Sequence, residues 1–153
     1  MSLTLRSGGA IDNHAGLAAG LQAAIAKFTA AGKQVWLIGP IPEVGYNVPR
    51  ALYLKRLGIP SSIEIRPSVQ EFNERQRFVF ALFARLSKDY AVGTVWPHQS
   101  LCDSDFCEVE TNGRPLYTDD QHLTRAAAIS LAEIFDPIFA NRVVSDRPVA
   151  KAP

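Results

Sequence analysis

The sequence predicts an α/β domain built around a parallel sheet, and two observations carry this prediction. A short apolar run at residues 35–38 and the segment AVGTVW at residues 91–96 are each followed by glycine or proline, as is typical of buried strands. Segments with helical periodicity separate these runs, in the order helix, strand, helices, strand, hairpin, helix. Strands that alternate with helices in this way indicate parallel strands connected through helices.

The composition fits one globular domain. The 153 residues are 47% hydrophobic and 20% charged, with a formal net charge of +1. Such a chain is neither disordered nor fibrous, and it can bury a sizeable core. The balanced charge argues against nucleic acid as a partner. No run approaches the roughly 20 apolar residues of a membrane-spanning helix, and the N-terminal residues lack the pattern of an export signal.

The first predicted helix covers about residues 13–31 and is followed by a strand at residues 35–38. Asp12 is a suitable N-cap, and Gly32 can end the helix. Because the strand is an unbroken apolar run, we expect it to be buried on both faces. One face of the helix is apolar and consists of Leu17, Leu21, Ala24, Ile25 and Phe28.

Two helices are predicted between the strands. Pro49 suits the first turn of a short helix that ends near Gly58. Ser68 is predicted to cap a long helix over about residues 69–88, and Glu71 completes a capping box. The inward face of this long helix is predicted to be Phe72, Val79, Leu82, Phe83 and Leu86.

The C-terminal part contains a predicted hairpin and a last helix. Asn112-Gly113 is the dipeptide most typical of a two-residue hairpin turn. Thr124 is a suitable cap for a helix over about residues 125–135. Residues 142–153 are polar and aperiodic, so we expect a loosely ordered tail after a domain that covers residues 1–141. The inward side of the last helix is predicted to be Ala127, Leu131, Ile134 and Phe135.

The strongest candidate for chemistry is the segment Asp119-Asp120-Gln121-His122. An aspartate three residues before a histidine on a turn can accept a hydrogen bond from one ring nitrogen. The other nitrogen is then free to act as a base toward a serine. Asp119 has this spacing, and Asp120 is the second candidate. The alternative is structural, because acidic residues before a helix also stabilise its positive end.

Cys102 and Cys107 are the only two cysteines. Their close spacing suits a disulfide, which would imply an oxidising compartment. A zinc site formed with His98 and His122 is the alternative, although no second closely spaced ligand pair accompanies the cysteines. Glu43 is a further candidate, because ligands bind in the loops at the carboxyl ends of parallel strands; the alternative for Glu43 is a solvated carboxylate.

The predicted sheet is incomplete. Two parallel core strands leave an apolar edge uncovered, which predicts self-association of the isolated chain. The sequence also contains no GxGxxG motif after a strand, no phosphate-binding loop and no GxSxG nucleophile elbow. Three common classes of nucleotide and hydrolase site are therefore not indicated.

Four stretches resemble one family, the SGNH domain fused to membrane acyltransferases of the acyltransferase-three family. They are the helix and strand region that ends in VWLIGPIPEVGYNVPRAL, the helix EFNERQRFVFALFARL, the segment VWPHQSLCDSDFCEVETNGRPLYTDDQHLT and the closing helix. The third stretch is the most specific, since it combines two cysteines, a glycine turn and PLYxDDxHLT. The resemblance covers most of residues 17–139 and corresponds to the C-terminal half of the domain.

The resemblance implies a three-layer α/β/α SGNH-hydrolase fold with a flavodoxin-like parallel sheet and a small hairpin. Asp119 and His122 match the DxxH motif of the family, and Cys102 and Cys107 match its paired cysteines. The implied reaction is bacterial O-acetylation of lipopolysaccharide or another surface glycan, or hydrolysis of such an ester, through a serine acyl-enzyme. An acyl donor and a glycan acceptor would be the substrates, without a cofactor. The implied location is periplasmic or otherwise extracytoplasmic, as part of a membrane protein.

The sequence departs from the family at the nucleophile. The family's serine lies in a Gly-Asp-Ser motif near the start of the domain, and no such motif occurs here. We therefore expect a partial domain that has the Asp–His arm, lacks the N-terminal strands and the serine, and is inactive alone. The upstream part of the same domain and a membrane acyltransferase domain are its expected partners. A non-catalytic remnant or interaction module is the alternative, followed by a small zinc-binding module.

Overall fold

The computed structural model describes residues 13–59 and 64–140. The predicted tail at residues 142–153 and the proposed cap Asp12 lie outside the described residues. None of the described helices is long and apolar enough to cross a membrane. The elements in chain order are α1 (Asn13–Ala30), β1 (Val35–Ile38), α2 (Val48–Arg56), α3 (Val69–Asp89), β2 (Val92–Val95), α4 (His98–Leu101), β3 (Glu110–Thr111), β4 (Arg114–Pro115), α5 (Arg125–Ser130), the 3-10 helix η1 (Ala132–Phe135) and α6 (Asp136–Ala140).

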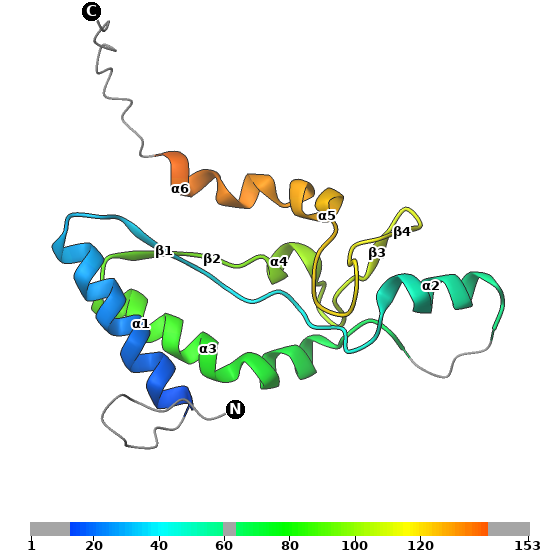
Figure 1. Ribbon diagram of the computed structural model, residues 1–153, viewed down its shortest axis with the longest axis horizontal. Helices are drawn as coiled ribbons and strands as arrows, with labels where there is room; N and C mark the ends of the chain where they lie inside the picture. The colour runs from blue at the N-terminus through cyan, green and yellow to red at the C-terminus, as the bar shows by residue number, and fades with distance from the viewer. Residues whose placement is uncertain (1–12, 60–63, 141–153) are drawn as a thin grey trace, which may run out of the picture.

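Strands β1 and β2 form the predicted parallel sheet (Figure 1). Their register pairs Val35 with Val92 and Ile38 with Val95. In the described part of the chain this sheet has two strands, so the outer edge of each strand has no neighbour. In Figure 1, α1 and α3 lie on one side of the sheet and the segment from α5 to α6 lies on the other. The fold is therefore mixed α/β, with helices around a parallel sheet.

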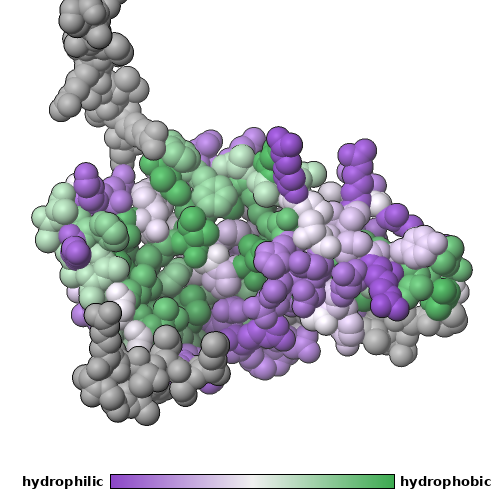
Figure 2. All heavy atoms as spheres, viewed as in Figure 1, coloured by the Kyte–Doolittle hydropathy of each residue, from purple (hydrophilic) through white to green (hydrophobic). Residues whose placement is uncertain are grey.

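The side of the sheet that faces α1 and α3 has an apolar core. Leu37 of β1 packs with Ile25 of α1 and with Leu82 and Leu86 of α3, and all four side chains are buried. Figure 2 shows hydrophobic residues gathered over the half of the molecule that contains α1 and the sheet. Burial of these side chains stabilises the contact between the two helices and the sheet.

Two expectations about burial differ from the structure. Leu17 and Phe28 on the predicted apolar face of α1 are about half exposed, whereas Ile25 on the same helix is buried against the sheet and α3. Ile38 is 53% exposed, so β1 is not buried on both faces. Side chains alternate along a strand, and Ile38 points away from the side on which Leu37 meets the helices.

Two tryptophans lie across glycines of the neighbouring strand region. A Cβ atom on Gly93 would overlap with the ring of Trp36, and a Cβ atom on Gly39 would overlap with the ring of Trp96. The strand register places Trp36 directly opposite Gly93. Glycine is needed at these two positions because a neighbouring ring occupies the space of a side chain.

A second core joins α2, the hairpin and α5, and it supports the candidate site. Thr124 caps α5 with its side chain, as predicted, and Asn47 caps α2. The predicted capping box between Ser68 and Glu71 begins α3. The buried members of this core are Val44, Val48, Leu52, Leu101, Val109, Leu116, Tyr117, Ala127 and Leu131.

The predicted hairpin is present, whereas the predicted last helix is divided. Asn112 and Gly113 connect β3 to β4 with φ angles of 49° and 71°, as a type I′ turn requires. The chain then forms α5, η1 and α6 in place of one helix. The hydroxyl of Ser130 donates to the carbonyl of Ala127, and such a bond from a side chain to the backbone weakens the continuation of a helix.

Candidate active site

Residues 117–123, the Asp–His loop, connect the hairpin to the segment before α5. Tyr117 and Leu123 form an isolated bridge at the base of this loop. The N–H of Thr118 donates to the carbonyl of His122 at 2.8 Å. Tyr117 is completely buried, and burial raises the pKa of its phenol to about 12. The loop is therefore anchored in the second core, while its tip is exposed.

The side chains of Asp119 and His122 contact each other within this loop. Oδ2 of Asp119 lies 2.8 Å from Nδ1 of His122. Oδ1 of Asp119 accepts hydrogen bonds from the N–H groups of Gln121 and His122, at 2.9 and 2.8 Å. One carboxylate thus fixes both the turn and the imidazole ring. The structure brings together the two residues that the sequence spacing selects.

The charge on Asp119 determines which ring nitrogen of His122 carries the proton. The backbone N–H groups of Gln121 and His122, and then the imidazole, bond to the carboxylate and lower the pKa of Asp119 from 3.8 to about 2. The ionised carboxylate only accepts hydrogen bonds, so Nδ1 of His122 donates. Nε2 of the neutral ring then has a free lone pair. The His122 side chain is 69% exposed, and Nε2 makes no hydrogen bond within residues 13–59 and 64–140.

The loop after β1 and the first residue of α2 support the Asp–His loop from the protein interior. The N–H of Val44 donates to the carbonyl of Asp120 at 2.8 Å, and the N–H of Val48 donates to the carbonyl of Asp119 at 3.1 Å. Both valines are buried in the second core. Gly45, at a φ of 77°, provides a left-handed turn between them. The sequence alone does not predict this support, although two apolar residues in a turn-rich loop are a signal of a buried anchor.

Two other candidates take different positions. The side chain of Asp120 is exposed and makes no bond to His122 among the described contacts, so the spacing of Asp119 is the one that reaches the ring. Glu43 forms an ion pair with Arg75, with 3.0 Å between Oε2 and Nη1. Glu43 therefore lies close to the support of the Asp–His loop but outside the Asp119–His122 contact itself.

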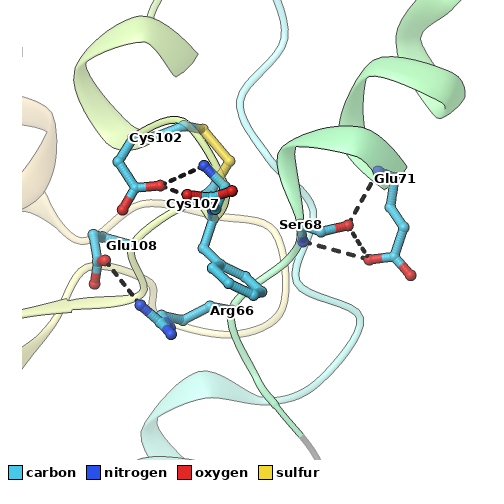
Figure 3. The surroundings of a disulfide bond; sticks show 9 residues. Arg66, Ser68, Glu71, Cys102, Cys107 and Glu108 are labelled. Carbon is cyan, nitrogen blue, oxygen red and sulfur yellow. Dashed lines mark hydrogen bonds and ion pairs between the residues drawn. A yellow bond between two sulfur atoms is a disulfide. The ribbon is translucent and has the colours of Figure 1, made fainter.

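Cys102 and Cys107 form a disulfide bond (Figure 3). Both sulfurs are used in this bond, so neither is a thiolate that could bind zinc. The ring of His98 lies against Phe72, with 5.1 Å between the ring centres. No group of three His, Cys, Asp or Glu side chains in the described segments is arranged to hold a metal ion. The zinc alternative does not fit this arrangement.

The disulfide loop packs against the start of α3. The carbonyl of Asp105 accepts from the N–H of Val69 at 2.9 Å, and the N–H of Cys107 donates to the carbonyl of Pro67 at 2.9 Å. These bonds join the disulfide loop to the segment before α3 and to its first residue. The disulfide therefore helps to fix the N-terminal end of the longest helix.

Residues 4–137 match the family described as SGNH domain (fused to AT3 domains). The chain belongs to this family. No curated protein matches it. Among solved structures, the chain is similar to the periplasmic domain of a lipopolysaccharide acetyltransferase from Salmonella ser. Paratyphi A. The TM-score is 0.60 and the sequence identity is 16%, over 85% of this chain and 51% of that chain.

Membership of the SGNH family confirms the resemblance seen in the sequence. The structural similarity confirms the SGNH-type α/β fold, and at 16% identity it concerns the fold alone. This SGNH chain spans about half the length of the Salmonella structure. The association of the family with AT3 domains indicates a membrane acyltransferase domain as the partner of such domains.

Proposed function

We propose that this chain contributes the Asp–His arm of an SGNH-type acyltransferase or esterase that acts on a surface glycan. The observation that carries the proposal is the 2.8 Å contact between Asp119 and Nδ1 of His122, which leaves Nε2 exposed. The similar Salmonella structure belongs to an acetyltransferase of lipopolysaccharide, which supports a glycan as the acceptor here. Its periplasmic origin supports the same location for this chain.

In the proposed reaction, a serine hydroxyl attacks the carbonyl carbon of an acetyl ester. Nε2 of His122 accepts the serine proton, and Asp119 stabilises the imidazolium that forms. The tetrahedral intermediate then collapses, the donor alcohol leaves with the proton from His122, and an acetyl-serine remains. A glycan hydroxyl or water attacks this ester while His122 again accepts a proton, and the serine is regenerated.

In this proposal, the serine comes from a part of the SGNH domain that these 153 residues do not contain. The sequence has no Gly-Asp-Ser motif. The chain covers 51% of the similar structure, and the described sheet has open edges at which further strands could pair. The chain alone is expected to be inactive, because loss of one member of a catalytic triad removes most of the rate.

The surroundings of the proposed site fit an exported enzyme. The disulfide between Cys102 and Cys107 suits an oxidising compartment such as the periplasm. The family's fusion to AT3 domains supports a membrane acyltransferase domain as the source of the acyl group. The surface glycan would then receive the acyl group on the periplasmic side.

A non-catalytic interaction module is the second candidate, and the open sheet favours it. Ile38 is 53% exposed, and the described sheet leaves both outer strand edges unpaired. A chain with such an edge is expected to self-associate when it is isolated. The two candidate functions differ in one expectation. An acyltransferase or esterase loses activity when His122 is replaced, whereas a non-catalytic module has no activity that depends on His122.

The test uses the protein encoded by the reading frame extended upstream of the Met1 codon, assayed for hydrolysis of 4-nitrophenyl acetate. His122→Ala and Asp119→Ala are each expected to lower kcat/KM on the order of 10³-fold or more. Asp120→Ala is the matched control, because it removes an adjacent carboxylate that does not bond to the imidazole, and it is expected to keep the rate. An unchanged rate in His122→Ala, or an extended frame without a serine nucleophile, would overturn the proposal.

A further inference from the structure

A polar pocket of about 350 Å³ lies next to the Asp–His loop, and its size is within the range of small-molecule sites. Val44 lines this pocket, and the N–H of Val44 donates to the carbonyl of Asp120 at 2.8 Å. One wall of the pocket is therefore a residue that supports the Asp–His loop. The rest of the lining comes from the loop after β1, the segment before α3 and α3 itself. It includes Tyr46, Arg66, Glu71, Phe72 and Arg75.

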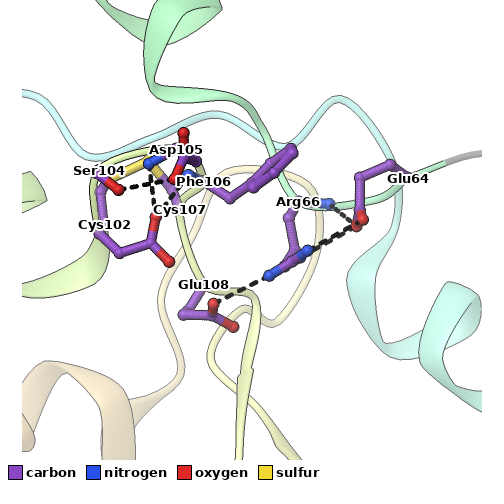
Figure 4. Close-up of polar contacts among 9 residues, drawn as sticks. Glu64, Arg66, Cys102, Ser104, Asp105, Phe106, Cys107 and Glu108 are labelled. Atoms are coloured by element: carbon purple, nitrogen blue, oxygen red, sulfur yellow. Dashed lines mark hydrogen bonds and ion pairs between the residues drawn. A yellow bond between two sulfur atoms is a disulfide. The ribbon is translucent and has the colours of Figure 1, made fainter.

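The arginines of this pocket are already paired with carboxylates. Nη1 of Arg75 lies 3.0 Å from Oε2 of Glu43. The guanidinium of Arg66 lies between two carboxylates, 3.2 Å from Glu64 and 3.3 Å from Glu108 (Figure 4). The positive charge of each guanidinium is therefore balanced by a neighbouring glutamate, while its N–H groups can still donate hydrogen bonds.

The remaining carboxylate makes the pocket slightly negative. Glu71 accepts a hydrogen bond from the hydroxyl of Ser68 in the capping box of α3 (Figure 3). Together with two other glutamates and two arginines in the lining, it leaves one negative charge. An anion such as phosphate would meet these carboxylates and would have to separate an arginine from its partner. A cation would have to compete with the arginines, because two of the three carboxylates are already paired with them.

A neutral ligand with many hydroxyl groups avoids both penalties. Each hydroxyl donates one hydrogen bond and accepts others, so it can use the carboxylate oxygens and the guanidinium N–H groups of the pocket together. Tyr46 lines the pocket and is 48% exposed, so an aromatic side chain is accessible there. Sugars combine hydroxyl groups with apolar C–H faces, and such faces pack well on aromatic rings.

We propose that this pocket binds a neutral sugar residue of the glycan that accepts the acyl group. The assignment as the acceptor site rests on the proposed function, whereas sugar binding itself can be measured without any reaction. A sugar held here would lie against the residues that support the Asp–His loop.

The 153-residue protein, labelled with ¹⁵N, is titrated with maltose, lactose and N,N′-diacetylchitobiose and followed by NMR. At least one of these neutral disaccharides is expected to cause saturable shifts at the amides of Gly45, Tyr46 and Phe72. Tyr46→Ala is expected to weaken this binding roughly tenfold. Tyr53→Ala is the matched control, because Tyr53 is 61% exposed and lies outside the pocket lining, and it is expected to bind as wild type does.

Inorganic phosphate is the comparison for ligand charge and is expected to cause no saturable shift at these amides. Arg75→Gln provides a second variant, which removes an exposed guanidinium from Glu43 and is also expected to weaken sugar binding. Three results would each overturn the proposal. The first is no saturable shift with any of the three sugars, and the second is sugar binding by Tyr46→Ala and Arg75→Gln that equals that of wild type. The third is saturable binding of phosphate.

The two proposals fail in different ways. The variant His122→Ala is expected to keep sugar binding, because His122 is not part of the pocket lining. If sugars bind as expected but the longer protein keeps its rate in His122→Ala, the proposed function is wrong and the pocket assignment stands. If the rate depends on His122 but no sugar binds, the pocket assignment is wrong and the proposed function stands.

Discussion

Asp119 holds both the backbone and the ring of His122 with a single carboxylate. Oδ2 lies 2.8 Å from the ring nitrogen Nδ1, and Oδ1 accepts the His122 N–H at 2.8 Å. The carbonyl of Asp119 is itself bonded to the N–H of Val48 at 3.1 Å. The orientation of the imidazole therefore depends on the start of α2 and on the second core as well as on the local turn.

The carboxylate of Asp119 is expected to stabilise the fold in a pH-dependent way. Its pKa falls from 3.8 to about 2 on folding. A carboxyl group whose pKa is lower in the folded protein contributes its full stabilisation when the pH is above its pKa in the unfolded chain. This stabilisation is lost as the pH falls through the pKa of the folded protein, here between about pH 4 and pH 2. The free energy of unfolding of Asp119→Asn, measured in urea, should therefore be below that of wild type at pH 6 and approach it near pH 2. A constant difference over this range would contradict the prediction. Asp120→Asn is the control and should unfold like wild type at pH 6.

His98 is expected to lower stability at mildly acidic pH. Its ring packs against Phe72, Phe80 and Trp96, and its buried Nδ1 has no hydrogen-bond partner in the described structure. Burial lowers the pKa of His98 below 6.5. Stability is therefore complete above about pH 6.5 and falls as the pH drops through the folded pKa, where the buried ring must take up a charge. His98→Phe should reduce the loss of unfolding free energy between pH 7.5 and pH 5, whereas Gln99→Ala on the same short helix should not. Equal losses in His98→Phe and wild type would show that His98 is not the cause.

The disulfide between Cys102 and Cys107 is expected to stabilise the protein by about 2 kcal/mol. It joins residues with a sequence separation of five, and the chain-entropy estimate for so short a loop has this size. Replacement of both cysteines by alanine should lower the free energy of unfolding by that amount and speed hydrogen exchange at the Val69 amide, which bonds to Asp105. Ser104→Ala, in the same loop, is the control. A double variant as stable as wild type would rule out this role.

Gly93→Ala is expected to destabilise the sheet. The added Cβ would overlap with the Trp36 ring, so the ring or the strand must move, and overpacking of this kind costs about 1–3 kcal/mol. Gly20→Ala is the matched control, because its added Cβ meets no atom within 4 Å. At this helical position alanine should raise the free energy of unfolding by about 0.5–1 kcal/mol. Equal stability of the two variants in urea unfolding would contradict the role of Trp36.

The features that the sequence predicts well are those formed by residues close to one another in the chain. The capping box of Ser68 and Glu71 and the turn at Asn112-Gly113 each involve only a few residues, so residue type and spacing determine them. The contact between Asp119 and His122 belongs to the same class, since one turn brings the two side chains together.

The features that the sequence does not predict depend on distant segments. The exposure of Ile38 depends on what covers the second face of the sheet, and an apolar strand has the same sequence whether that face is covered or not. The bonds from Val44 and Val48 to the Asp–His loop join residues more than 70 positions apart. Spacing along the chain contains no information about such pairs, whereas the folded structure identifies them directly.

The position of the ring proton on His122 is the most direct test of the Asp–His arm. ¹⁵N NMR of the imidazole in the 153-residue protein, at an alkaline pH where the ring is neutral, distinguishes a protonated from an unprotonated nitrogen. We predict that Nδ1 carries the proton and Nε2 does not, and that Asp119→Ala loses this preference. A proton on Nε2 in the wild-type protein, or the same distribution in Asp119→Ala, would contradict the proposed role of His122 as a base held by Asp119.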